Sequence, residues 1–370
     1  MKRMIAALAA AVILFCNAVN ADGIVPSVNA SAVALMYAEN GELIYGQNAD
    51  AQLPVASLTK IMTAVVALEN ASLDDVICVD RRACGIEGSS VYLTPGENLS
   101  VEDLLYALML QSANDAASAL AYGISGSIED FSVLMNQKAE DLGLMNTHFT
   151  NPHGLDEEEH YSSARDLAAL TVYALDNPDF LQIVSTYKRE LPFKDDPAGR
   201  VVYNHNRLLR TYDGCVGVKT GYTMRCGRCL VSAAERNGIT IVCVTLNDPD
   251  DWRDHKALLD YAFDAYTLYT PAQADREFFV HVISGVKDSL KCIADISPFL
   301  VRTTDVSGID REIRMKKFYY APVKNGEILG SVVYSIDGEI VASFEIKASE
   351  NCDKIKYRRN IFEIIRSWFG

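Results

Sequence analysis

Residues 56–60 read Ala-Ser-Leu-Thr-Lys, and an apolar run over residues 61–68 follows them directly. The run predicts a helix, which would place Ser57 and Lys60 on one face near its start because they are three residues apart. A serine hydroxyl is a poor nucleophile until a base takes its proton. A lysine can be that base when burial or nearby cations lower its pKa. The stretch therefore pairs a nucleophile with a possible base.

Ser-x-x-Lys by itself is also what a serine N-cap followed by a solvated lysine looks like. Two further motifs decide between the readings: Ser112-Ala113-Asn114 and Lys219-Thr220-Gly221 lie downstream in that order. Ser-x-x-Lys, a Ser-x-Asn variant and Lys-Thr-Gly occur together in penicillin-binding proteins and class A β-lactamases. The three motifs therefore favour serine acyl-transfer chemistry.

The sequence resembles one branch of these proteins, the low-molecular-weight D-alanyl-D-alanine carboxypeptidases. The likeness spans most of residues 30–270 and is carried, beyond the three motifs, by residues 54–63, 93–97, 151–156, 160–164 with Asp166, 204–209 and 218–223. It implies an α+β fold, in which a β-lactamase/penicillin-binding transpeptidase-like domain with an antiparallel sheet flanked by helices precedes a small all-β domain. In that family the all-β domain is a stalk.

Length and composition agree with this organisation. A chain of 370 residues is long for one core, and 49% hydrophobic with 22% charged residues is a globular composition. We expect a peptidase domain over 22–270 and a small all-β domain over 271–350. The net charge of −15 argues against nucleic acid as a partner.

Both ends of the chain predict export and membrane contact. Residues 1–21 have the basic, apolar and small-residue regions of a cleaved signal peptide; a lipoprotein signal acylated at Cys16 and an uncleaved anchor are the alternatives. Residues 351–370 are expected to hold an amphipathic membrane-interface helix, or else a helix packed on the protein. The predicted location is the outer face of the cytoplasmic membrane, or the cell-wall compartment, of a bacterium.

Hydrophobic periodicity orders the elements. We expect a hairpin over 33–37 and 43–45, strands over 216–223, 229–234 and 239–246, and helices over 101–110, 128–142, 164–177 and 258–267. Ser100 would cap the first of these helices, and residues 112–114 would form a loop after it. In the all-β region the expected strands are 277–283, 290–293, 312–319, 328–336 and 339–346.

The resemblance implies a role for each motif residue in removing the terminal D-alanine from peptidoglycan stem peptides that end in D-Ala-D-Ala. Ser57 would attack the penultimate carbonyl, with Lys60 as general base and Ser112 passing a proton to the leaving amine. Asn114 would bind the substrate's backbone. The remaining motif residues would complete the substrate site: Lys219 and Thr220 at the carboxylate, Gly221 by allowing close approach, and the Tyr222 N–H with that of Ser57 as oxyanion donors. β-Lactams would be covalent inhibitors.

Cysteines and histidines do not form a second chemical site in this pattern. Of nine cysteines Cys16 leaves with the signal, and the spacing of the others does not reveal whether disulfides form. Cys226-Gly227-Arg228-Cys229 lacks the second pair that a zinc site needs, so a structural or free-thiol role is expected. His153 and His160 are interpreted as structural. No metal and no cofactor is expected.

Three other functions remain possible from the sequence. A serine β-lactamase shares the motifs but needs a further positioned base, and no Glu-x-x-Leu-Asn segment follows Asn114. A D,D-endopeptidase would differ only in substrate shape. A non-catalytic peptidoglycan-binding protein would keep the fold without needing all motif side chains.

Overall fold

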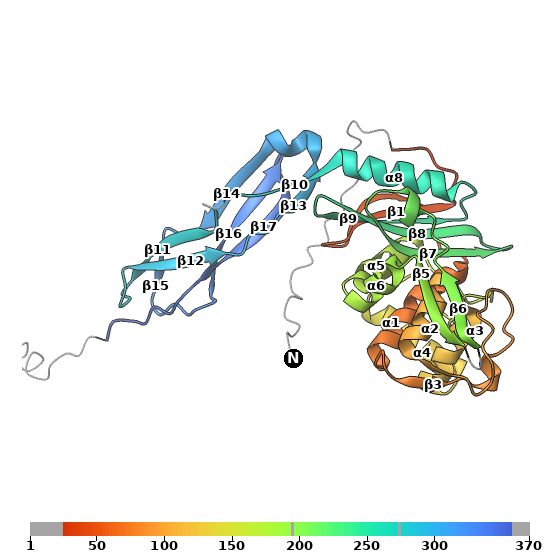
Figure 1. Cartoon of the computed structure of the whole chain (residues 1–370). Helices are drawn as coiled ribbons and strands as arrows, with labels where there is room; N and C mark the ends of the chain where they lie inside the picture. Colours follow the sequence, from red (N-terminus) through yellow and green to blue (C-terminus); the bar gives the residue numbers. More distant parts are fainter. Residues whose placement is uncertain (1–24, 194–195, 273–274, 357–370) are drawn as a thin grey trace, which may run out of the picture.

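The structure is a computed structural model that describes residues 25–193, 196–272 and 275–356. Figure 1 shows a sheet with helices on both faces, followed by a second, separate sheet. The first sheet is antiparallel throughout, in the strand order β2-β1-β9-β8-β7. The predicted α+β fold class is therefore confirmed.

The first sheet joins distant parts of the chain. Its strands are β1 (Ala32–Tyr37), β2 (Glu42–Gln47), β7 (Cys215–Thr223), β8 (Gly227–Arg236) and β9 (Ile239–Leu246). All five lie where strands were expected, and they exceed the predicted ranges by at most two residues at either end. β1 and β9, the first and last of these strands in the sequence, lie side by side in the sheet, with Ala32 paired to Leu246.

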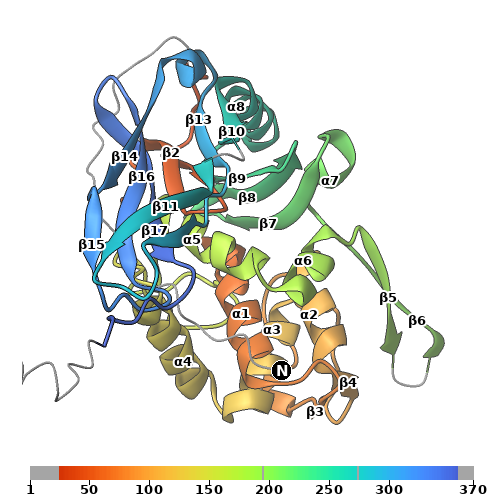
Figure 2. The ribbon, with the colours of Figure 1, turned by 90° about the vertical axis from the view of Figure 1, so that its left-hand side faces the viewer.

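Alternation along β1 explains how one sheet serves two hydrophobic cores. Successive side chains of a strand point to opposite faces, and all six in β1 are buried. Ala34 enters the core shared with the helices of residues 60–185, and Leu35 enters the core under α8 (Asp251–Ala265). Figure 2 shows α8 on one side of this sheet and the helices of residues 60–185 on the opposite side.

The helical block lies between β2 and β7 in the sequence. Its elements are the 3-10 turn η1 (Ala56–Thr59), α1 (Lys60–Asn70), α2 (Val101–Leu110), α3 (Asn114–Ser125), α4 (Ile128–Asp141), α5 (Ala164–Leu175), α6 (Pro178–Ser185) and α7 (Leu208–Thr211). The predicted cap of α2 is confirmed, because Ser100 Oγ accepts from the Asp103 N–H at 3.0 Å.

Two helix predictions were wrong at their ends. The expected helix 164–177 begins as predicted but ends at Leu175. Asn177 instead accepts from the N–H groups of Asp179 and Phe180 and so caps the next helix, α6. The expected helix 258–267 begins earlier and stops at Ala265. The chain then extends into β10 (Tyr266–Tyr269), which pairs with β13 (Phe299–Arg302). This pairing overrides the helical pattern.

Two short hairpin-like pairs complete the helical side. β3 (Val76–Cys78) pairs with β4 (Asn98–Ser100), and β5 (Lys188–Phe193) pairs with β6 (Asp196–Tyr203). Figure 2 shows the β5–β6 hairpin projecting from the helical side. Arg200 of β6 contacts both carboxylate oxygens of buried Glu97, at 2.9 and 3.2 Å, and so ties the hairpin to the segment before α2.

The second sheet has the order β14-β16-β17-β12-β11-β15. Its strands are β11 (Glu277–Ile283), β12 (Ser289–Ala294), β14 (Ile309–Met315), β15 (Phe318–Tyr320), β16 (Ile328–Ile336) and β17 (Glu339–Ala348). The expected single strand 312–319 was wrong: it is two strands, at opposite edges of the sheet. A core of its own, including Val282 and Tyr334, lies under this sheet.

Residues 351–356 continue along the second sheet, through bridges between Val323 and Cys352 and between Gly285 and Lys354. The predicted signal peptide and the amphipathic pattern from Arg359 onward lie outside the described residues. Within the described ranges, no helix combines the length and the apolar character that a membrane crossing requires.

Candidate active site

Lys60 lies at the centre of the polar contacts around Ser57. Its Nζ is 2.9 Å from Ser57 Oγ, 2.7 Å from Asn114 Oδ1 and 2.5 Å from the carbonyl oxygen of His153. The Lys60 side chain is fully buried, whereas Ser57 is only partly buried. The structure thus brings together a reachable hydroxyl and an amine held from three directions.

Backbone geometry explains how Ser57 is presented. It lies in η1, just before α1 begins at Lys60, and Ala56 before it has a positive φ of 45°. The loop holding Gly154 closes against this turn: a Cβ on Gly154 would lie 1.9 Å from the Ala56 oxygen, and its φ is +82°. Only glycine fits there without displacing backbone.

His160 supports the same turn rather than the reacting atoms. The Thr150 N–H donates to its Nδ1 at 3.1 Å, so Nε2 carries the proton and donates to Thr59 Oγ1 at 2.7 Å. The Thr59 hydroxyl in turn donates to the Ala56 oxygen at 2.8 Å. Burial lowers the pKa of His160 to about 4, so this ring is neutral at pH 7.

Burial and like charge together change the protonation of Lys60. Its pKa is lowered well below 10.5, first by desolvation and then by the nearby charge of Lys219, while Asp115 acts in the opposite sense. A lowered pKa favours the neutral amine, which is the form that can accept a proton.

Ser112 and Lys219 form a second pair of side chains. Ser112 lies between α2 and α3 with a positive φ of 61°, and Lys219 Nζ donates to its Oγ at 3.0 Å. Lys219 also donates to the Thr220 oxygen at 2.9 Å. Burial lowers the pKa of Lys219 to about 7. Both lysines of the site are therefore buried and perturbed, and each contacts one serine.

Asn114 begins α3, and its side chain is engaged at both ends. Nδ2 donates to the Glu87 oxygen at 2.6 Å while Oδ1 accepts from Lys60. A Cβ on Gly88 would lie 2.9 Å from that Nδ2. The neighbouring Asp115 accepts from Ser90 Oγ at 2.5 Å and the Leu93 N–H at 2.9 Å. The loop over residues 87–93 is thus fixed onto the start of α3.

β7 passes directly beside the Ser57 turn. A Cβ on Gly221 would lie 3.1 Å from the Val55 oxygen and 3.3 Å from the Ser57 nitrogen. Thr220 is partly buried, and Tyr222 is 66% exposed. All eight residues that the sequence singled out therefore lie in η1, α1, the α2–α3 connection, the start of α3, or β7.

Sequence reasoning missed the backbone and supporting groups of this site. The His153 carbonyl, the loop over 87–93 and the tight contact at Gly154 are set by tertiary packing. In the sequence, the segments 151–156 and 160–164 stand out only as parts of a resemblance. The glycine and histidines of these segments, which recur in the family pattern, were the only indication in the sequence that the segments support the site.

Cys226 and Cys229 lie in and after the turn that joins β7 to β8. Both are buried, and the Cys229 thiol donates to the Cys226 carbonyl oxygen at 3.8 Å. The Cys226 sulfur accepts from the Thr223 N–H at 3.2 Å. The neighbouring Cys229 thiol lowers the pKa of Cys226 to about 7. All eight cysteines in the described ranges are free thiols. Among those same residues, no group of three or more His, Cys, Asp or Glu side chains is arranged to hold a metal ion.

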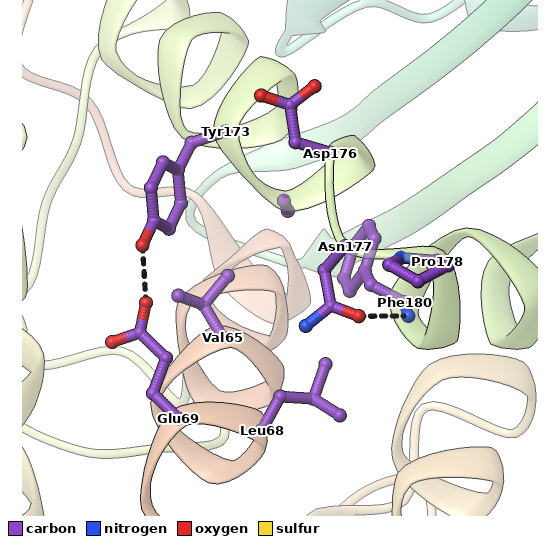
Figure 3. A pocket seen from close by; sticks show the side chains of 9 residues that line it. Val65, Leu68, Glu69, Tyr173, Asp176, Asn177, Pro178 and Phe180 are labelled. Carbon is purple, nitrogen blue, oxygen red and sulfur yellow. Dashed lines mark hydrogen bonds between the residues drawn. The ribbon is translucent and has the colours of Figure 1, made fainter. Parts of the chain in front are cut away.

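Figure 3 shows a separate cavity of about 350 Å³ at the opposite end of α1 from Ser57. It lies among the ends of α1 and α5 and the start of α6, with Val65, Leu68 and Phe180 in its wall. Its one carboxylate from α1, Glu69, accepts from the Tyr173 hydroxyl at 2.5 Å. None of the predicted site residues lines this cavity.

Known proteins share both the sequence and the fold. The Peptidase_S11 family, D-alanyl-D-alanine carboxypeptidase, matches residues 18–250. D-alanyl-D-alanine carboxypeptidase DacF of Bacillus subtilis is 31% identical over 92% of this chain and 90% of its own length. DacC of Escherichia coli is 31% identical over 93% and 90%.

Penicillin-binding protein 5 from Haemophilus influenzae superposes with a TM-score of 0.78 at 29% identity, over 89% of this chain and 99% of that one. The Streptomyces K15 DD-transpeptidase, in the form of a mutant, covers 64% of this chain and 99% of its own with a TM-score of 0.61 and 32% identity. The family match covers more than half of the chain and includes all three motifs. The chain therefore belongs to the Peptidase_S11 family and is a serine-type D-alanyl-D-alanine carboxypeptidase.

Proposed function

We propose that this carboxypeptidase works through a covalent acyl-enzyme on Ser57, formed from stem peptides that end in D-Ala-D-Ala. The observation that carries the proposal is the set of three contacts at Lys60 Nζ. The oxygens of Asn114 and His153 can only accept hydrogen bonds. A neutral amine has two hydrogens, which these oxygens take, so its lone pair is left facing the hydroxyl of Ser57.

The proton movements follow from this geometry. Lys60 takes the proton from Ser57 Oγ as that oxygen bonds to the penultimate carbonyl carbon. Ser112, hydrogen-bonded to Lys219, is the hydroxyl on the other side of the site, and it delivers a proton to the leaving D-alanine amine. Water then attacks the ester, and Ser57 regains its proton when the shortened peptide leaves.

Substrate binding is assigned to β7 and the turn at Ser57. The N–H groups of Ser57 and Tyr222 stabilise the oxyanion, and Gly221 allows the strand to come within contact of that turn. Lys219 and Thr220 attract the terminal carboxylate. Asn114 already bonds Glu87 and Lys60, so it contacts the substrate's backbone by releasing the Glu87 oxygen or through a small movement of the 87–93 loop.

β-Lactams acylate the same serine in this proposal, and they remain bound because deacylation is slow. A serine β-lactamase needs a further carboxylate positioned to activate water. The buried carboxylate next to the site, Asp115, is occupied by the Ser90 hydroxyl and the N–H groups of Val91 and Leu93. This favours the carboxypeptidase over the β-lactamase.

The proposed setting is the outer face of the cytoplasmic membrane. Residues 1–21 direct export, 22–270 form the peptidase domain, 271–350 form a β-domain that acts as a stalk, and the amphipathic pattern from Arg359 contacts the membrane interface. The names of the relatives, D-alanyl-D-alanine carboxypeptidases, support a substrate that would be found at this location.

The test uses residues 22–370 and the matched Ser57→Ala variant. The intact mass of each protein is measured after incubation with benzylpenicillin, and D-alanine release is measured with a D-Ala-D-Ala peptide. We expect a lasting penicilloyl adduct and D-alanine release in the parent only. Rapid penicillin turnover without an adduct would instead indicate a β-lactamase. Faster cleavage of cross-linked dimers than of pentapeptides would indicate an endopeptidase. The absence of both an adduct and turnover would indicate a non-catalytic binding protein.

A further inference from the structure

Three aromatic side chains gather on the exposed face of one edge of the second sheet. Phe279 on β11 is 68% exposed, and Phe318 and Tyr320 on β15 are 45% and 67% exposed. The rings of Phe318 and Tyr320 are 5.6 Å apart and nearly perpendicular. We call these three residues the aromatic face.

Strand pairing places the three on one side of the sheet. In β11 the alternate residues Phe278, Val280 and Val282 are buried, so Phe279 and its neighbours two residues on point the other way. β15 runs parallel to β11. Its Phe318 pairs with His281 and its Tyr320 with Ile283. The aromatic face is therefore continuous across both strands, and it is the solvent side of the sheet.

Exposed aromatic rings of this kind are costly to leave in water. Scattered surface apolar residues are normal, but three aromatic rings on paired strands form a patch that marks an interaction site. The other half of the same face is different: Lys291 on β12 pairs with Glu277 at 2.9 Å. Ile293, also on β12, is 43% exposed, so this half mixes charged with aliphatic side chains. The exposed aromatic rings of the second sheet all lie on β11 and β15.

Positive charge flanks this edge. Lys316 and Lys317 directly precede β15 and are exposed, as are Lys354 and Lys356. Asp288 and Asp353 lie nearby and reduce the net charge, so the edge is only moderately basic. Aromatic rings beside lysines are the composition found where proteins lie in the headgroup region of a bilayer.

The described chain also ends at this edge. The Ile355 N–H donates to the Ser284 oxygen at 2.9 Å, directly after the end of β11. Fourteen residues, 357–370, follow. Their amphipathic pattern was the basis for expecting membrane contact. The two views of Figures 1 and 2 place β15 at the end of the second sheet away from α8, so the catalytic unit leaves this end free.

From these observations we infer that the aromatic face inserts its rings into the interface of an anionic bilayer and is a second membrane contact beside the terminal segment. The inference rests on the proposed location at the membrane. It adds that the β-domain itself touches lipid, which fixes the orientation of the enzyme at two points instead of one.

Position-specific quenching tests this directly. The full mature chain carrying Trp252→Phe and Trp368→Phe receives one new tryptophan, by Phe318→Trp. Ile313→Trp, on the opposite edge strand β14, is the matched control. Both are mixed with vesicles of phosphatidylcholine containing phosphatidylglycerol brominated on its acyl chains. We expect quenching at position 318 and none at 313.

A second measurement compares partitioning of the full chain onto the same vesicles. Phe279→Ser with Phe318→Ser and Tyr320→Ser should weaken binding about tenfold, since each ring contributes buried apolar area. A control triple, Val306→Ser with Ile313→Ser and Ile340→Ser, should leave binding unchanged. Circular dichroism and D-alanine release confirm that both variants are folded.

Each other outcome has a definite meaning. Vesicle binding without quenching at position 318 would show that the terminal segment acts alone, and would overturn the inference while leaving the proposed location intact. No vesicle binding at all would overturn both. Concentration-dependent dimerisation in solution that only the aromatic triple abolishes, without an effect on vesicles, would assign the aromatic face to a second copy of this chain.

Discussion

Lys60 Nζ lies 2.9 Å from Ser57 Oγ, in a position where the lysine side chain is wholly buried. The short distance alone would give a hydrogen bond of ordinary strength. Burial changes the role of this contact, because it lowers the pKa of Lys60 and so favours the neutral amine, the form that can take a proton from the hydroxyl. The second lysine of the site adds to that effect, which can be measured.

Replacing Lys219 by glutamine should move the acid limb of the pH profile. Lys219 lowers the pKa of Lys60 by like-charge repulsion, so its removal raises that pKa. A base acts above its pKa, and the rate of acylation by benzylpenicillin should therefore begin to fall at a higher pH in the variant. Lys138→Gln, remote on α4, is the control. An acid limb that stays in place would contradict the assignment of Lys60 as base.

Lys219→Met should stabilise the folded chain at pH 7 by on the order of 1–3 kcal/mol, because a buried cation is removed. The folded pKa of about 7 lies below the usual 10.5, so the unfolded chain binds more protons between these values. The parent therefore gains stability as pH rises through this range, and the difference between the two proteins shrinks. Urea denaturation at pH 7 and pH 9 measures both; a difference that grows with pH would contradict the burial argument.

Gly154→Ala should disrupt the Ser57 turn. Its Cβ would lie 1.9 Å from the Ala56 oxygen, and the residue has a positive φ. We expect a loss of about 3 kcal/mol or more in the free energy of unfolding. Penicillin acylation should be impaired as well. Gly143→Ala is the matched control, because its φ is +69° but nothing lies within 4 Å of the new Cβ.

The Gly143→Ala control should lose only about 1 kcal/mol in the free energy of unfolding, which is the conformational cost of the positive φ alone. Equal losses in the two alanine variants would show that packing of the 151–154 loop against the Ser57 turn does not matter.

Mild acid should destabilise the protein through its buried histidines. Burial lowers the pKa of His153 to about 3, of His160 to about 4 and of His255 to about 3. These groups are neutral when folded and protonated when unfolded, so stability is lost as pH falls from about 6.5 towards 4. Each contributes a slope of up to about 1.4 kcal/mol per pH unit.

His255→Gln isolates one of these contributions. His255 is a buried residue of α8 whose ring nitrogens lie 2.6 Å from Ser232 Oγ on β8 and 3.0 Å from Thr245 Oγ1 on β9. Urea titrations at pH 7, 6 and 5 should show a shallower dependence in this variant, by about one proton. An unchanged slope would mean that His255 is not neutral in the folded chain.

Local pattern was sufficient for most elements. The strands β1, β9, β11 and β16 and the helix α2 were predicted almost residue for residue, since alternation or a capped apolar stripe is written in consecutive residues. The errors came where distant segments decide. Residues 266–269 join a strand contributed by 299–302, and the single run 312–319 divides to reach both edges of a sheet.

The sequence by itself determined the fold class, the family and the eight residues of the candidate site, because three motifs with fixed internal spacing carry that information. Only the tertiary structure decided the chemical state of those residues. Whether Lys60 is a cation or a base depends on its burial, on Lys219 from another strand and on the His153 oxygen from another loop. Electrostatic interactions depend on distances in space, and the spacing of residues along the chain does not give those distances.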